Sequence, residues 1–452
     1  VWTADLGGDL TQATIAGGRA YLVRKDTCEV ICLDLADGKT RWKRSFPAAL
    51  DGPPTIVGDR LYLGSRDGRV HCLRAADGAT VWRFLAAPLD RLTLSDDRIE
   101  SLWPVSSSVI VYNGLVYAVA GRSSYLDGGI RLDALDPATG AVRHTAVLEG
   151  PRPDKETLRT AVVTERDRRK ARESGDPEKL KAVNQAIRDE YATGYHLYGG
   201  EADLLVTDGK DIFLTQNKFD AKLNRIPLKR EWISGYTPMA ASHMMASAGF
   251  LDDTMMHRIF MVYDDAWPSY GSGPGSAARG GTVVAVGKER AYAAQHHEGG
   301  GYAGHVPGSG NRIVADALET ENLAGGMLKE RLKREGGLGD KRFDRVADPL
   351  WVTETPVILR AILVAPDGRG GERVFTAGIV EGKAREAWDK SAWFVGPGKL
   401  LVHDGADGKP LAEYDLPACP VFEGLSAAQG RLLVVLADGR VADGPIVREF
   451  ER

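Results

Sequence analysis

Residues 15–22, with the sequence IAGGRAYL, recur as IVGDRLYL over residues 56–63 and more loosely as VYNGLVYA over residues 111–118. Each copy places apolar residues on both sides of a short segment that contains glycine, which predicts two strands joined by a tight turn. A repeated supersecondary unit indicates an array of equal parts rather than several unrelated domains. This repeat therefore decides the fold.

A tryptophan marks the same period, because Trp2, Trp42 and Trp82 are spaced by 40 residues. Between these tryptophans, a third strand is expected at residues 29–33 and again at residues 69–73, where apolar and polar residues alternate.

A turn with Asp or Thr before Gly follows the third strand of each copy. It reads DLADGK at 34–39, RAADGA at 74–79, DPATG at 136–140 and DGADGK at 404–409. Such a turn needs a positive φ near its end, which glycine adopts at little cost. A fourth strand is expected after the turn, so that each unit is a four-stranded antiparallel sheet.

This unit resembles the repeat of PQQ-like β-propellers, the superfamily that holds the quinoprotein dehydrogenases and an outer-membrane assembly lipoprotein. The resemblance is strong over residues 1–150, fair over 202–295, and returns at 392–443. It implies an all-β propeller in which the tryptophan that ends each blade docks between neighbouring blades. In the third blade, Arg143-His144 stands in place of the tryptophan.

About seven four-stranded blades are expected, with eight as the alternative because residues 296–390 are hard to assign. The fragment 1–6 matches an outermost strand without its inner strands, and residues 430–436 and 439–441 can supply them. The two ends of the chain are therefore expected to share one blade and close the ring, which removes exposed sheet edges. The whole chain, 1–452, is then a single propeller domain.

Two segments depart from the strand pattern. Residues 151–200 contain a charged helical hairpin, in which Asp176 is a suitable cap and Pro177 a suitable first helical residue, and residues 316–345 contain a second helical insertion. Positive and negative charges balance over residues 154–192. This hairpin is either a solvated face or an arm that binds a protein partner.

Composition excludes several classes of function. The chain has 58 Lys and Arg against 62 Asp and Glu, a net charge of −4, which gives no electrostatic reason to expect nucleic acid or an anionic membrane as a partner. No apolar run is long enough to predict a membrane span. The four cysteines form no CxxC pair and no CxxCH box, which argues against covalent haem. Cys32 and Cys72 share one repeat position and are expected to be buried apolar residues.

Three stretches keep polar residues beside aromatic ones and depart from the blade pattern, namely 100–105, 120–129 and 249–258. They resemble a subfamily of exported bacterial PQQ-like propeller proteins of unknown activity, which implies a periplasmic or extracellular location. A removed export signal is compatible with Val1, which opens directly into strand-like sequence.

Arg122, Tyr125 and Asp127, next to Glu100, can line one mouth of the central channel. There an arginine would hold a carboxylate or sulfate while Tyr and His act as acid and base, a combination that suits an acidic sugar. The alternative is structural, with Arg–Asp pairs buried between sheets that tie the third blade to its neighbour. The candidate residues are Tyr125, His257 and Arg258 as catalytic groups and Glu100, Trp103, Arg122, Asp127, Asp252 and Asp253 as ligand-binding groups.

A histidine-rich loop is the strongest metal signal, with His296, His297 and His305 around a glycine-rich segment. Imidazoles are good ligands for Zn, Cu, Mn or Fe, and the glycines can fold His305 back toward His297. His243 and His257 can complete such a site. Exposed loop histidines without a metal are the alternative, because the spacing is not diagnostic.

Three functions remain open at this stage, and the sequence does not decide whether the chain is an enzyme. The first is an exported propeller that binds a small molecule or glycan at the channel mouth, with carbohydrate lyase or hydrolase chemistry. The second is a non-catalytic scaffold that binds protein through blade edges and the 154–192 hairpin. The third is a subunit that holds a divalent metal or a redox group. PQQ itself is not expected, because the adjacent cysteines of quinoprotein dehydrogenases are absent.

Overall fold

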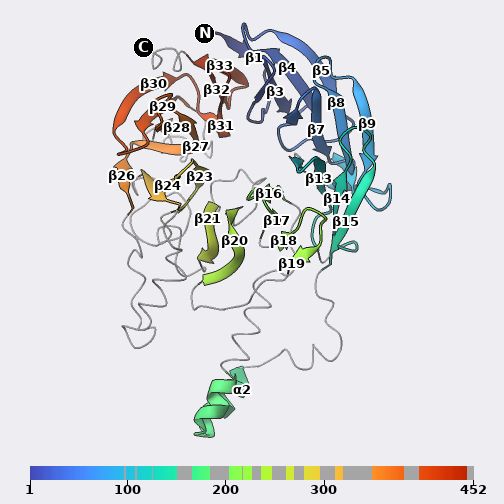
Figure 1. The fold of residues 1–452 in the computed structure, drawn as a ribbon, viewed down its shortest axis with the longest axis vertical. Coiled ribbons are helices and arrows are strands. Elements are labelled where there is room, and N and C mark those ends of the chain that lie inside the picture. The colour runs from blue at the N-terminus through green and yellow to red at the C-terminus, as the bar shows by residue number, and fades with distance from the viewer. Residues whose placement is uncertain are drawn as a thin grey trace.

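The computed structural model arranges the chain as a ring of antiparallel sheets (Figure 1). It describes residues 1–95, 98–106, 109–124, 126–149, 165–183, 203–215, 217–226, 236–246, 261–268, 279–295, 311–318, 349–380 and 396–444, with the backbone alone at 165–168, 236–240 and 264–268.

Three four-stranded blades follow one another at the start of the chain, each with its strands hydrogen-bonded in sequence order. Their strands are β2 (Thr14–Ala16), β3 (Arg19–Arg24), β4 (Glu29–Asp34) and β5 (Thr40–Ser45); β6 (Thr55–Val57), β7 (Arg60–Ser65), β8 (Arg69–Arg74) and β9 (Thr80–Leu85); and β12 (Ile110–Tyr112), β13 (Leu115–Ala120), β14 (Ile130–Leu135) and β15 (Val142–Leu148).

The next four blades continue the ring, and the fifth of the series is described by three strands. Their strands are β16 (Val206–Thr207), β17 (Ile212–Leu214), β18 (Asn217–Phe219) and β19 (Arg225–Ile226); β20 (Tyr236–Ala246), β21 (Met261–Pro268) and β22 (Gly280–Gly281); β23 (Val283–Val286), β24 (Arg290–Gln295), β25 (Arg312–Ala317) and β26 (Trp351–Glu354); and β27 (Val357–Pro366), β28 (Glu372–Val380), β29 (Gly398–Asp404) and β30 (Pro410–Leu416).

The eighth blade joins the two ends of the chain. It contains β31 (Pro420–Ala428), β32 (Arg431–Leu436), β33 (Arg440–Gly444) and, as its outermost strand, β1 (Thr3–Asp5). Thr3 lies opposite Ala442 and Asp5 opposite Arg440. The predicted ring closure is therefore confirmed, and the blade count is the higher of the two that the sequence allowed.

The pattern of buried residues in each strand depends on how the adjacent blades pack against it. In the first blade the central residues of β3 and β4 are all buried, whereas β5 alternates between exposed and half-buried residues. The middle strands are packed on both faces by adjacent blades, so they need apolar residues on both faces, and only the outer strand shows a clear period of two.

The repeated tryptophans dock on the next blade, as predicted. The indole nitrogen of Trp2 donates to the carbonyl of Leu35 at 3.0 Å, that of Trp42 to Ala75 at 3.2 Å and that of Trp82 to Pro137 at 3.0 Å. Trp351 on β26 does the same to Gly405 at 3.1 Å. This fourth docking tryptophan lies within the segment that the sequence repeat did not assign.

The glycine of each turn is required by the docked tryptophan as well as by the backbone. Gly78 has a φ of 71°, and a Cβ atom there would lie 2.8 Å from the ring of Trp42. Gly140 has the same relation to Trp82, again at 2.8 Å. A side chain at either position would push the indole out of its place between the blades.

None of the four cysteines is in a disulfide bond, and the two that share a repeat position are buried, as expected. Cys32 and Cys72 are buried and form no disulfide, and each lies opposite the docking tryptophan of its own blade. Burial raises the pKa of each thiol to about 11. These two side chains are therefore small apolar packing groups.

Part of the predicted helical hairpin is described. Helix α2 (Glu165–Glu173) is followed by a turn in which the Asp176 carboxylate accepts hydrogen bonds from the backbone N–H groups of Glu178 and Lys179, as a helix cap does. Residues 319–345, most of the second predicted insertion, lie outside the described residues. Over the described part of the chain, no helix combines the length and the apolar character needed to span a membrane.

Candidate functional site

A two-stranded hairpin is inserted between the second and third blades, formed by β10 (Leu92–Ser95) and β11 (Arg98–Ser101). It lies across the turns that join the second and third strands of the first two blades. Arg98 donates to the carbonyl of Lys25 at 3.3 Å, and the N–H of Ser101 donates to the carbonyl of Arg66 at 2.7 Å. The hairpin is therefore fixed to one face of the ring.

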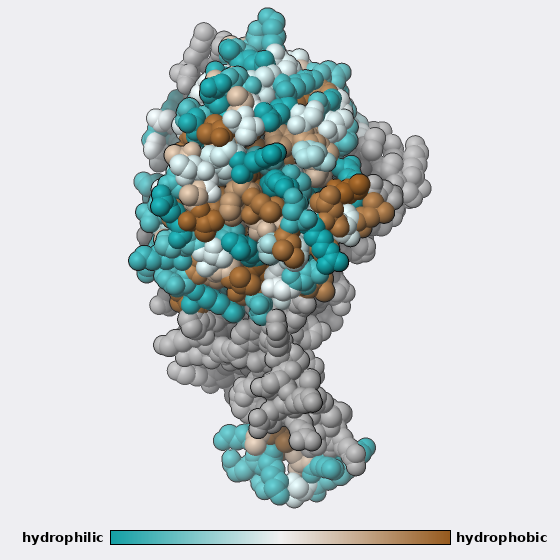
Figure 2. Space-filling view, turned by 90° about the vertical axis from the view of Figure 1, so that its right-hand side faces the viewer, coloured by the Kyte–Doolittle hydropathy of each residue, from teal (hydrophilic) through white to brown (hydrophobic). Residues whose placement is uncertain are grey.

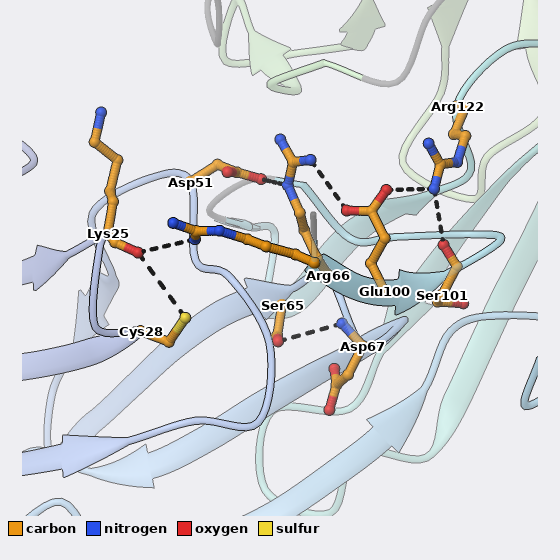
Figure 3. A network of polar contacts seen from close by, with 10 residues as sticks. Lys25, Cys28, Asp51, Ser65, Arg66, Asp67, Glu100, Ser101 and Arg122 are labelled. Carbon is orange, nitrogen blue, oxygen red and sulfur yellow. Dashed lines mark hydrogen bonds and ion pairs between the residues drawn. The ribbon is translucent and has the colours of Figure 1, made fainter. Parts of the chain in front are cut away.

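Glu100 on β11 is the centre of the polar contacts in this region (Figure 3). Its side chain is 2% exposed and accepts from Arg66 at 3.0 Å and from Arg122. Arg122 also donates to the carbonyl of Ser101 at 3.3 Å, and Arg66 donates through Nε to Asp51 at 2.7 Å. Two arginines from neighbouring blades are thus held by one enclosed carboxylate.

The charge states in this network follow from burial and pairing. Burial raises the pKa of Asp51, although the hydrogen bond from Arg66 opposes it. For Arg66, burial alone would lower the pKa, but the hydrogen bonds to Asp51 and Glu100 outweigh burial and raise it. The arginine therefore stays charged and links the two carboxylates.

Trp103 packs inside the apolar core between the second and third blades, where it is 7% exposed. Its indole nitrogen donates to the carbonyl of Asp127 at 2.9 Å, and its backbone N–H donates to the Ser101 hydroxyl at 3.1 Å. Asp127 itself is exposed with a φ of 52°. Trp103 therefore positions the 121–129 loop against the hairpin.

The outward face of the hairpin is apolar. Leu94 lies directly opposite Ile99, and Leu92 lies two residues before Leu94 on the same face. Leu92 is 56%, Leu94 71% and Ile99 66% exposed, and Leu89, just before the hairpin, is 60% exposed. We call Leu89, Leu92, Leu94 and Ile99 the hairpin surface.

Hydrophobic residues are visible among hydrophilic ones on the side of the molecule shown in Figure 2, which is the right-hand side of Figure 1. The hairpin surface is not among the sites predicted from the sequence. The alternation of Leu92, Thr93 and Leu94 before a polar turn was the available signal, since it is typical of a strand with one apolar face.

The structure brings together part of the predicted polar site. Glu100 and Arg122 are in direct contact, and Trp103 and Asp127 are joined through the backbone of Asp127. The remaining predicted residues lie outside the described residues. They are Tyr125, Asp252, Asp253, His257, Arg258, His296, His297 and His305.

His243, which the sequence offered as a further metal ligand, has both ring nitrogens engaged. Nδ1 lies 2.7 Å from the carbonyl oxygen of Ala241 and Nε2 lies 2.8 Å from that of Thr215. The ring stacks on Phe213 with centroids 4.0 Å apart. Burial lowers the pKa of His243, and its contacts link the fourth and fifth blades.

The tryptophans whose side chains are described are all engaged in packing. The described indoles of Trp2, Trp42, Trp82 and Trp351 are engaged between blades, and that of Trp103 lies in the core, so none of these five is available as the floor of a cofactor site. The chain also lacks adjacent cysteines.

Comparison with known proteins agrees with the repeat geometry. A family model of PQQ-like repeats, described as "Outer membrane protein assembly factor BamB", matches residues 1–185. Residues 1–185 of this β-propeller are PQQ-like repeats. This match covers the first three blades and the inserted hairpin.

Two curated relatives match parts of this chain. A polyvinylalcohol dehydrogenase of Pseudomonas sp. is 30% identical over 82 residues, which are 18% of this chain and 13% of that protein. The outer membrane protein assembly factor BamB of Moranella endobia is 30% identical over 159 residues, 32% of this chain and 34% of that protein. The matches therefore span about a third or less of each relative.

Among solved structures, BamB from Moraxella catarrhalis aligns with 98% of this chain and 96% of its own chain, at 10% identity and a TM-score of 0.47. A quinohemoprotein alcohol dehydrogenase from Pseudomonas putida aligns with 96% of this chain and 70% of its own, at 13% identity and a TM-score of 0.48.

Proposed function

We propose that this propeller is a non-catalytic scaffold that binds a protein partner at the hairpin surface. The observation that carries the proposal is the group of four large apolar side chains, each more than half exposed, on and just before a hairpin fixed to the ring. Single exposed apolar residues are ordinary, but a contiguous group on an ordered element is typical of an interaction site. The family match over residues 1–185, whose description names an assembly factor, supports the same class of function.

The contacts of Arg122 give less support to a glycan site. Arg122 is a receptor for a sugar carboxylate only if it is free of internal anions, and Glu100 already pairs with it. The network of Glu100, Arg66 and Arg122 suits the structural alternative that the sequence allowed, a tie between adjacent blades. Glycan binding with lyase or hydrolase chemistry, and a metal at His296, His297 and His305, stay predictions.

The predicted partner arm at 154–192 offers a weaker surface than the hairpin. From Arg169 to Lys181 its side chains are mainly charged and exposed, and Arg169 pairs with Glu173 within the helix. Surface pairs of this kind contribute little to binding or stability. We therefore place the partner site on the inserted hairpin and keep the arm as a secondary contact.

The test is co-purification of the full chain from its natural host after chemical cross-linking in the cell. The double variant Leu94→Asp, Ile99→Asp is expected to lose the partner at least tenfold without a change in Tm, because both side chains lie in solvent in the free chain. Val147→Asp is the matched control, since Val147 is 54% exposed on β15, a strand of the third blade that does not pair with the hairpin. Retention of the partner by the double variant would contradict the proposal.

We also propose that the chain acts outside the cytoplasm, in the periplasm or beyond the cell. This rests on the resemblance to exported propellers and on the match to a family whose description names an outer-membrane factor. Fractionation of the natural host with an antibody against the ring would place the chain, and recovery in the cytoplasmic fraction would contradict this location.

A further inference from the structure

The innermost strand of the eighth blade contains a wide bulge. β31 lies at the opposite end of its sheet from β1. Its pairing with β32 places Pro420 opposite Leu436 and then Leu425 opposite Val434. Residues 421–424 therefore stand opposite one residue, Val435, and must loop away from the sheet.

The bulge reaches across the centre of the ring. Phe422 packs against clusters that contain Met261 of the fifth blade, Val284 of the sixth and Ile358 of the seventh. A side chain from the eighth blade can touch the fifth and sixth blades only through the central channel. The bulge of residues 421–424 therefore lies in that channel, and Figure 1 shows β31 and β27 on the inner side of the ring.

Glu423 in this bulge has an unfavourable backbone conformation and a carboxylate without a partner among the described residues. Its φ is 54°, in the left-handed region that residues other than Gly, Asn and Asp rarely adopt. Within the part of the chain that the structure describes, its carboxylate has no hydrogen-bond or ion-pair partner, and burial raises its pKa to about 7. The residue keeps some exposed surface. Carboxylates held inside a protein are normally paired, so a strained and unpaired one indicates a group that a ligand completes.

Charged residues on the strands packed around β31 do not supply the missing partner. They are Arg360 on β27, Glu372 and Arg373 on β28, and Arg431 on β32. Glu372 accepts from Tyr292, and Arg431 pairs with Asp443. Burial is the cause that raises the pKa of Glu423.

We propose that the bulge is a binding site for a small primary amine, held by the Glu423 carboxylate and by the ring of Phe422. An ammonium group supplies the positive charge and the N–H donors that the carboxylate lacks. The aromatic ring of the preceding residue offers a surface for an aliphatic tail or for the cation itself. An anion would be repelled, and a divalent metal needs more oxygen ligands than one carboxylate provides.

The site is tested with n-butylamine as the probe, by isothermal titration of the full chain at pH 8, with 1-butanol as the uncharged probe. Saturable binding of the amine and none of the alcohol is expected. Glu423→Gln, which keeps the shape and removes the charge, is expected to weaken binding at least tenfold. Glu413→Gln is the matched control, because Glu413 lies on the exposed strand β30, where it pairs with Lys399, and it is expected to bind like the unchanged chain.

A second titration at pH 5 separates the charge from the shape of the site. Protonation of Glu423 is expected to weaken amine binding at least tenfold relative to pH 8. The proposal is overturned if Glu423→Gln, folded with an unchanged circular dichroism spectrum, binds the amine as well as the unchanged chain does. Equal binding of 1-butanol, or no saturable binding of the amine, overturns it as well.

Discussion

Two carboxylates inside this ring have opposite surroundings. Glu100 is held by Arg66 and Arg122 from adjacent blades, whereas Glu423 has no partner among the described residues and a pKa raised to about 7 by burial. In the first arrangement each charge compensates the other, so no charge is left buried without a partner. The second costs stability, which fits the role in binding that we propose for Glu423.

Glu423→Gln is expected to stabilise the protein in a pH-dependent way. The pKa of Glu423 rises from 4.5 in the unfolded chain to about 7 in the folded chain. The contribution of this group to the free energy of unfolding is therefore fully present below pH 4.5, and it is lost as the pH rises through 7 and the carboxyl group ionises. Above pH 8 the variant should be more stable by up to about 3 kcal/mol. Urea unfolding at pH 5 and pH 8 measures the difference, and equal free energies of unfolding at pH 8 would show that Glu423 is well solvated.

Arg122→Ala is expected to lower the free energy of unfolding by about 1–3 kcal/mol, because Glu100 keeps Arg66 but loses one of its two arginines. Arg143→Ala serves as the control. Arg143 lies on the exposed outer strand β15 and pairs with Asp136 in the preceding turn, so its loss should cost under about 1 kcal/mol. Denaturant titration of both variants decides between a structural and a binding role. No loss of stability in Arg122→Ala would return this arginine to the list of ligand-binding candidates.

At the scale of the blade, an aromatic pair holds the interface that follows each of the first two blades. Tyr21 and Trp42 both donate to the carbonyl of Ala75, and Tyr62 and Trp82 both donate to that of Pro137. One carbonyl of the next blade thus accepts two bonds while the two rings bury their faces beside it.

Trp42→Ala is expected to cost about 3–5 kcal/mol, since it removes both the indole packing and its hydrogen bond. Gly78→Ala should cost less in the Trp42→Ala background than in the unchanged chain, because the new Cβ atom no longer meets the indole. Thermal unfolding of the two single variants and the double variant tests this coupling. Additive losses would mean that the glycine is needed for its backbone conformation alone.

The interface between the third and fourth blades lacks the tryptophan and compensates with a leucine. His144 lies opposite Ala134, where Trp42 and Trp82 lie opposite Cys32 and Cys72 in the first two blades. In the facing turn, Leu223 has a φ of 62° and is 3% exposed, at the left-handed position that is glycine in the other turns. With no indole to meet, this position can hold a side chain, and the leucine joins the core beside Tyr117.

A double-mutant cycle tests whether His144 and Leu223 together replace the tryptophan–glycine pair of the other interfaces. Leu223→Gly alone should destabilise by about 2–4 kcal/mol through the lost apolar side chain, and His144→Trp alone should destabilise through a clash with Leu223. The double variant is expected to be more stable than the sum of the single losses predicts, because it restores the tryptophan–glycine pair of the other interfaces. Thermal unfolding measures all four proteins, and strict additivity would show that the two sites do not touch.

These elements also show how far the sequence predicts the structure. The docking of Trp2, Trp42 and Trp82 and the closing role of residues 1–6 follow from the repeat, because packing between blades imposes the same residues at the same positions. Trp351 was missed because residues 318–350, which lie between β25 and β26, interrupt the 40-residue period. Glu423 carried no local signal, since its enclosure arises from blades far away in the sequence.

At the scale of the whole ring, consecutive blades are joined on the inside as well as on the outside. The hydroxyl of Ser426 on β31 donates to the carbonyl of Ala13 at 2.6 Å, and that of Thr14 on β2 donates to Pro54 at 2.8 Å. Thr55 on β6 continues the series to Val109. The three interfaces that run from the eighth blade through the first and second to the third thus each have two hydrogen bonds. One is donated by a hydroxyl group on the inner strand and one by a tryptophan at the outer strand.

The closing blade is the part of the ring where these bonds depend on the chain's first residues. Removing residues 1–6 takes away Trp2, whose indole holds the first blade, and Leu6, which is buried in the core shared by the first and eighth blades. The loss should be about 3–5 kcal/mol, more than Trp2→Ala alone costs. It should also leave β33 as an open edge, so the shortened chain is expected to self-associate in size-exclusion chromatography while Trp2→Ala stays monomeric. A shortened chain that remains monomeric with an unchanged Tm would mean that the other interfaces hold the ring without its closing strand.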